Sequence, residues 1–156
     1  MNDAEFLRSF EDCTLPNTAF HHRDHVRLGW LYLRRYPALD ALARFTGGLK
    51  RFAAANGKPG LYHETITWAY LLLIHERMAR SALTSPGPSS PAPSLPPSPG
   101  EEGRKAETWE EFARRNPDLL VWSPSVLDCY YEKETLGSEL ARRVFVLPDR
   151  CGDPVS

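Results

Sequence analysis

Residues 66–74 read Ile-Thr-Trp-Ala-Tyr-Leu-Leu-Leu-Ile, and this run decides the fold class. Its apolar side chains cover every face of a helix rather than a single stripe, a pattern typical of a helix surrounded by other elements. The run predicts a central helix from about Tyr62 to Arg80, with Trp68 and Leu72 buried. The apolar run itself is shorter than the roughly 20 apolar residues that a membrane span requires.

The segments on either side of this helix also have helical patterns. Apolar residues recur at intervals of three and four, and Pro or Asn-Gly sequences end most of the segments. Helices are expected before the central one at about Glu5–Cys13, His22–Tyr36 and Ala38–Ala55, and after it at Thr108–Arg115, Ser125–Tyr131 and Lys133–Phe145. No segment keeps the alternating pattern of a strand. The sequence therefore predicts an all-α fold, a compact helical bundle.

A segment rich in proline and serine interrupts these helices. Residues 85–100 read SPGPSSPAPSLPPSPG, a composition that offers little apolar surface to offset the entropy lost on ordering. We expect residues 81–105 to be a disordered linker inserted within a single helical domain, 1–156. Two interpretations stay open, a tolerated loop insertion and a proline-rich ligand for a partner domain.

Composition excludes several classes of function. The chain has 156 residues, 42% of them hydrophobic, with 19 basic and 20 acidic residues, and a net charge of −1. Because the charges are interspersed, no basic surface for nucleic acid or an anionic membrane is expected. The acidic start of the chain, Met1-Asn2-Asp3-Ala4-Glu5, does not have the form of a secretory signal, so a cytoplasmic location is expected. The three cysteines are widely spaced, which predicts neither a disulfide framework nor a thiolate zinc site.

Four of the five histidines lie at the starts of two expected helices. They occur in Phe20-His-His-Arg-Asp-His25 and in Tyr62-His-Glu-Thr65. His22 and His25 are three residues apart, so a helix brings their side chains to neighbouring positions that suit two ligands of one metal ion. His63 opens the central helix, which is expected to pack against the helix that carries the other two. The pattern predicts a metal site of His22, His25 and His63.

The residues beside His63 suggest how such a site would work. Glu64 lies about 100° further round the helix, so it suits a base beside the metal rather than a fourth ligand. Thr67 stands where the H-E-x-x-H zinc motif has its second histidine, so that motif is absent. Tyr62 and Thr65 are expected to be polar groups of a substrate pocket. Nitrogen ligands suit Zn, Fe or Cu, and three of them leave a position open for water or substrate.

The first hypothesis is therefore a small metal-dependent enzyme that acts on a small-molecule substrate. Two other interpretations of the histidines stay open, structural roles at helix starts and a metal-free acid–base pair. A rival from another class is a non-catalytic interaction module, which would meet a protein partner through the proline-rich segment and an exposed pair, Tyr130-Tyr131. The sequence predicts no oligomeric state.

Three segments also resemble a group of short bacterial proteins that have no assigned activity. The similar segments are FHHRDHVRLGWLYL at 20–33, YHETITW at 62–68 and NPDLL at 116–120. The resemblance covers most of the chain outside the proline-rich segment. It implies that these segments belong to one all-α domain into which that segment is inserted, and it implies no reaction.

Overall fold

The computed structural model describes residues 1–84 and 106–150, and the regular structure of these residues is helical. The helices are α1 (Asp3–Glu11), α2 (His22–Arg35), α3 (Ala38–Ala55), α4 (Glu64–Thr84), α5 (Trp109–Arg115), α6 (Pro117–Leu120), α7 (Lys133–Leu136) and α8 (Glu139–Arg143). Three short 3-10 turns are η1 (Asn17–Ala19), η2 (Pro59–Leu61) and η3 (Val126–Cys129). The predicted all-α fold is confirmed. Most of the predicted linker, from residue 85 to residue 105, lies outside the described residues.

Three expected boundaries are wrong. Helix α4 continues to Thr84, so residues 81–84 belong to the helix rather than to the linker. The helix expected over Ser125–Tyr131 is only the 3-10 turn η3. The helix expected over Lys133–Phe145 is divided into α7 and α8, because the Ser138 side chain accepts a hydrogen bond from the Ala141 N–H and starts a new helix.

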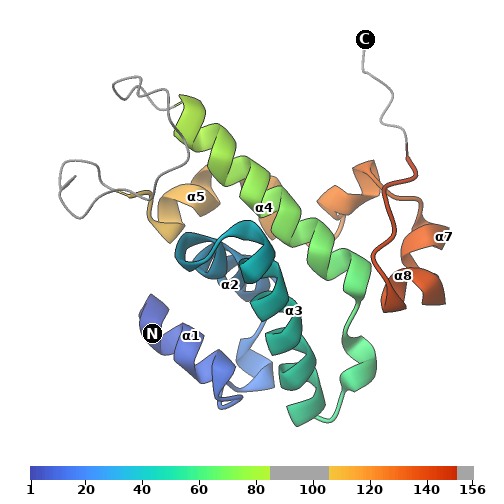
Figure 1. Ribbon diagram of the computed structural model, residues 1–156, viewed down its shortest axis with the longest axis horizontal. Coiled ribbons are helices and arrows are strands. Elements are labelled where there is room, and N and C mark those ends of the chain that lie inside the picture. The colour runs from blue at the N-terminus through green and yellow to red at the C-terminus, as the bar shows by residue number, and fades with distance from the viewer. Residues whose placement is uncertain (85–105, 151–156) are drawn as a thin grey trace.

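Helices α2, α3 and α4 form the centre of the molecule, and each contacts the other two. Helix α1 packs on α2 and α3. Helix α6 lies against α2 and is joined to α5, while α8 packs on α4 with α7 beside it (Figure 1). The long helix α4 thus has the N-terminal helices on one side and the α7–α8 region on another.

A single hydrophobic cluster contains residues from both sides of the 85–105 gap. Trp30 of α2 lies 5.8 Å from Trp109 and 6.3 Å from Phe112 of α5, measured between ring centroids. Phe112 is completely buried. Burial of aromatic rings contributes strongly to core stability, so α5 is an integral part of the core.

Helix α4 is less completely buried than its sequence predicts. Leu71 and Ile74 are buried on the side that faces α2, whereas Leu72 is 43% exposed and Trp68 is partly buried. The prediction for Leu72 is wrong, because α2 and α3 cover one side of α4 and no described element covers the position of Leu72. None of the described helices combines the length and the apolar character needed to cross a membrane.

Candidate functional site

A pocket of about 580 Å³ opens between α2, α3, η2 and the start of α4. Its wall is largely apolar and includes Phe20, Val26, Phe45, Leu49, Phe52 and Ile66. Phe10 of α1 stacks behind this wall, with its ring 5.6 Å from Phe20 and 5.5 Å from Phe52. The core therefore supplies a second layer of aromatic rings behind the pocket wall.

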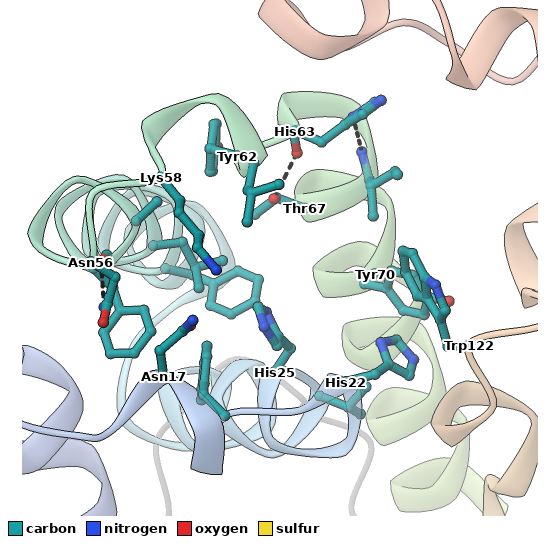
Figure 2. Close-up of a pocket in the computed structure, with 18 of the residues that line it drawn as sticks. Asn17, His22, His25, Asn56, Lys58, Tyr62, His63, Thr67, Tyr70 and Trp122 are labelled. Carbon is teal, nitrogen blue, oxygen red and sulfur yellow. Dashed lines mark hydrogen bonds between the residues drawn. The ribbon is translucent and has the colours of Figure 1, made fainter.

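His25 points into this pocket from α2, with the polar ends of Asn17 and Lys58 directed towards the same space (Figure 2). Its ring packs on Phe20 at 4.1 Å between centroids and forms no hydrogen bond within residues 1–84 and 106–150. Burial lowers the pKa of His25 to about 4, with a smaller contribution from the nearby charge of His22. The ring is therefore neutral at pH 7 and presents one donor and one acceptor nitrogen.

His22 lines the same pocket one turn earlier, but one of its nitrogen atoms is engaged. Its Nε2–H donates to the carbonyl oxygen of Leu119 in α6 at 2.8 Å. The ring contacts Tyr70 edge-on and Trp122 at centroid distances of 4.9 and 5.2 Å. Burial lowers the pKa of His22, an effect opposed by the bond to Leu119. His22 joins α2 to α6 and keeps only Nδ1 for a ligand.

Both ring nitrogens of His63 are engaged in the structure. Nε2–H donates to the Leu136 carbonyl oxygen at 2.7 Å, and Nδ1 accepts from the Ile66 N–H at 3.1 Å. The second bond caps the start of α4, where backbone N–H groups have no partner within the helix. In Figure 2 the ring of His63 is directed away from His25. His63 therefore anchors α4 to α7.

Glu64 and Tyr62 belong to a network at the edge of the pocket. Glu64 Oε1 accepts from the Trp68 indole N–H at 2.6 Å and from the Tyr62 hydroxyl at 3.1 Å, and Oε2 lies 3.3 Å from Lys50 Nζ. Burial raises the pKa of Tyr62, and the charge and hydrogen bond of Glu64 add to this effect. Tyr62 lines the pocket, whereas Glu64 is not among the lining residues.

Thr65 is placed outside the pocket. It is completely buried, donates to the Val144 carbonyl oxygen at 2.8 Å and accepts from the Val146 N–H at 3.0 Å. The polar threonine of the pocket is Thr67, whose hydroxyl donates to the His63 carbonyl oxygen. Thr65 instead fixes the segment after α8 to α4.

The three predicted metal ligands line one pocket but do not converge on one point. Among the residues that the structure describes, no group of three or more His, Cys, Asp or Glu side chains is arranged to hold a metal ion. His22 and His25 come from adjacent turns of α2, whereas both nitrogens of His63 are bonded elsewhere. A metal shared by all three requires His63 to give up at least one of these bonds.

Several lining residues were not predicted from the sequence. They come from short loops and from the C-terminal region, and they are Asn17, Asn56, Lys58, Trp122 and Arg142. Asn56 and Lys58 flank Gly57, whose φ of +70° makes the turn out of α3. In the sequence, the Asn56-Gly57 pair predicts only the end of a helix. No sequence pattern connects these residues with His25, because only the tertiary fold brings them together.

Of the two residues expected to form an exposed pair, Tyr130 and Tyr131, only Tyr130 is exposed. Tyr130 is 38% exposed, but Tyr131 is buried at 2% and its hydroxyl donates to the Val146 carbonyl oxygen at 2.7 Å. The prediction is wrong for Tyr131, since this ring holds the C-terminal segment in place. Tyr130 by itself offers little apolar area to a partner.

Comparisons with protein-family models, with curated proteins and with solved structures found no match. The resemblance to short bacterial proteins therefore stays a prediction.

Proposed function

We propose that this chain binds a small, mainly apolar molecule in the pocket between α2, α3 and α4, with His25 as the central polar contact. The observation that carries the proposal is an imidazole that faces an apolar cavity of about 580 Å³ and has no hydrogen-bond partner in the described chain. Sites for small molecules are commonly concave and apolar, with a few polar groups that fix the ligand.

The low pKa of His25 favours recognition over acid–base catalysis. A general base works best when its pKa lies near the working pH, and a value of about 4 is well below neutrality. A neutral imidazole instead donates one hydrogen bond and accepts another. In an apolar pocket such bonds discriminate between ligands that can pair with the imidazole and ligands that cannot, because a buried polar group left unpaired costs about 1–3 kcal/mol.

A bulky residue in the pocket wall tests the binding site. Ala53 lines the pocket, whereas the adjacent Ala54 is exposed on α3. Ala53→Phe is expected to abolish binding of the probe 2-naphthol, as measured by saturation-transfer NMR. Ala54→Phe is the matched control and should bind as the parent does. The proposal fails if the parent does not bind 2-naphthol, or if both variants bind it equally well.

His25→Phe tests the polar contact, since it keeps an aromatic ring and removes both nitrogens. Loss of one hydrogen bond to the 2-naphthol hydroxyl should raise its Kd about fivefold or more. His75 is exposed on α4, so His75→Phe provides a control. An unchanged Kd in His25→Phe would remove His25 from the proposal.

The metal-dependent enzyme is the second candidate, favoured by the observation that His22, His25 and His63 line one pocket. The metal would be Zn, Fe or Cu, with Glu64 as the base beside it. Elemental analysis after metal-replete expression tests this candidate. A near-stoichiometric metal, lost in each single alanine variant of the three histidines but kept in Glu64→Gln, would support it. A parent protein with no bound metal, or three alanine variants with full metal content, would reject it.

A further inference from the structure

We infer that the ligand of this pocket is an aromatic monocarboxylate, an inference that rests on the proposed binding function. The wall supplies the surface for an aromatic ring, and the charges of the lining residues favour an anion. These two properties come from different residues and can be tested separately.

The pocket lining has a charge bias that the chain as a whole does not have. Its 19 residues include the cations Lys58 and Arg142 but neither Asp nor Glu. The whole chain, in contrast, has 20 acidic residues for 19 basic ones. Two acids directly neighbour lining histidines in the sequence. Glu64 contacts Lys50, and Asp24 accepts a hydrogen bond from the His21 N–H. An anion in the pocket therefore meets attraction without repulsion from a lining carboxylate.

Lys58 and Arg142 form no ion pair with any carboxylate in the described ranges, unlike several other cations of this protein. Arg27 and Arg77, for example, lie 2.5 and 2.7 Å from Asp3 and Asp118. Arg142 is held at the pocket by a hydrogen bond to the Gly60 carbonyl oxygen in η2, and Lys58 directly precedes η2. The amine of Lys58 is directed into the pocket, towards the ring of His25 (Figure 2). Both cations thus lie at the η2 side of the pocket.

The aromatic side chains of the lining suit an aromatic body. Phe20, Phe45, Phe52, Tyr70 and Trp122 line the pocket together with aliphatic side chains. Aromatic pairs gain about 0.5–1.5 kcal/mol beyond the burial of their area. A flat ring placed among these side chains directs its carboxylate towards Lys58, with the neutral His25 able to donate a further hydrogen bond.

The test compares 2-naphthoate with 2-naphthamide, which has nearly the same shape and no charge. Kd values are measured by saturation-transfer NMR or by tryptophan fluorescence. We expect 2-naphthoate to bind up to about five times more tightly than 2-naphthamide, because one partly solvated ion pair contributes up to about a fivefold gain. Higher salt should weaken binding of the naphthoate only.

Lys58→Met should raise the Kd of 2-naphthoate about fivefold and leave that of 2-naphthamide unchanged. Lys133→Met removes the same charge from α7, away from this pocket, and should change neither Kd. Helical circular dichroism confirms that each variant is folded. Equal binding of the two probes, with no effect of Lys58→Met, would reject the carboxylate while the apolar pocket stands. Failure of both probes to bind would reject the proposed function itself. Binding of 2-naphthoate that survives Ala53→Phe would place the anion elsewhere and overturn the inference.

Discussion

The histidines of this pocket differ in what their ring nitrogens bind. His63 and His22 donate to backbone carbonyl oxygens of α7 and α6, so each ties two distant parts of the chain together. His25 has no such bond and faces the cavity. The same residue type at a helix start thus serves as an anchor in two places and as an open polar group in a third. Only the third has both ring nitrogens free to recognise a ligand without disturbing the fold.

Stability should fall in mildly acidic solution because of His25. Its pKa in the folded protein, about 4, lies below the ordinary value of 6.5, so protons bind more readily to the unfolded chain. The contribution is fully present above pH 6.5 and is lost as the pH falls towards 4. We expect the free energy of unfolding to drop by about 1–3 kcal/mol over this range, with His22 acting in the same direction.

Urea unfolding at several pH values between 7.5 and 4 checks this expectation. His25→Gln should flatten the pH dependence, since glutamine does not titrate. His75→Gln changes an exposed histidine and should retain the slope of the parent. If the parent and His25→Gln lose the same stability on acidification, His25 is not the group responsible.

Thr65 should be more important for stability than for binding. Thr65→Val keeps the shape of the side chain and leaves the Val144 carbonyl and the Val146 N–H without their partner. We expect a loss of about 1–3 kcal/mol in the free energy of unfolding, measured with urea. Thr46→Val is the control, because the Thr46 hydroxyl bonds only to carbonyl oxygens of its own helix. A small loss of stability in Thr65→Val, together with weaker 2-naphthol binding, would mean that Thr65 contributes to ligand binding in the pocket.

Two adjacent glycines of α3 should respond oppositely to alanine. A Cβ on Gly48 would lie 2.7 Å from the Phe10 ring, so Gly48→Ala has to displace α1 at a cost of about 1–3 kcal/mol. A Cβ on Gly47 meets only the end of Arg51 at 3.8 Å. Gly47→Ala should stabilise the protein by about 0.5–1 kcal/mol through helix propensity. Thermal unfolding of the two variants measures whether each change lowers or raises the stability of the protein. Equal changes in stability would show that Gly48 is not needed for the approach of Phe10.

Adjacent leucines of α4 provide a similar comparison. Leu71 is buried and Leu72 is 43% exposed. Leu71→Ala should cost about 2–5 kcal/mol, and Leu72→Ala about half a kilocalorie or less, when unfolding is followed with urea. A large loss in Leu72→Ala would mean that something outside the described residues, or a second molecule, covers this face.

The helices were predictable from the sequence because their signals are local. The capping box at Thr108–Glu111 and the breaks at Pro37 and Asn56-Gly57 are read within a few residues. The exposure of Leu72 was not predictable, because an apolar run does not show which faces its neighbours cover. The divided helix over 133–145 depended on one capping serine, Ser138.

The candidate site was predictable only in part. The spacing of His22 and His25 placed both on one side of α2, and both line the pocket. The positions of Lys58, Trp122 and Arg142 depend on tertiary contacts between segments far apart in the chain. The role of Thr65 is likewise set by a bond to Val144, 79 positions later. Sequence periodicity carries no information about such contacts.

At the scale of the whole molecule, a few bonds connect the region after residue 105 to the helices before residue 85. His22 bonds to α6, Arg77 bonds to Asp118 and Asn116, and His63 and Thr65 hold α7 and the segment after α8. Trp68 also stacks on Phe145 at 5.0 Å. The pocket needs both regions, since Trp122 and Arg142 come from the second one. Correct docking of the C-terminal region is therefore a condition for binding.

These connections predict that the two regions unfold together as one domain. Phe112 is completely buried against Trp30, so Phe112→Ala should cost about 3–5 kcal/mol. If the regions form one cooperative unit, this change in α5 lowers the stability of α1–α4 as well. Far-UV circular dichroism follows all helices, and within each protein its urea midpoint should coincide with that of tryptophan fluorescence. Both midpoints should be lower in the variant than in the parent.

Leu140→Ala is the control for this comparison, because Leu140 is 64% exposed on α8 and its loss should change stability by about half a kilocalorie or less. Two separate transitions in Phe112→Ala, with most helical signal surviving the first, would show that α1–α4 fold without the C-terminal region. The pocket would then be assembled only when that region docks on α4. Coincident transitions mean instead that the pocket forms as part of folding itself, with Trp122 and Arg142 in place before any ligand binds.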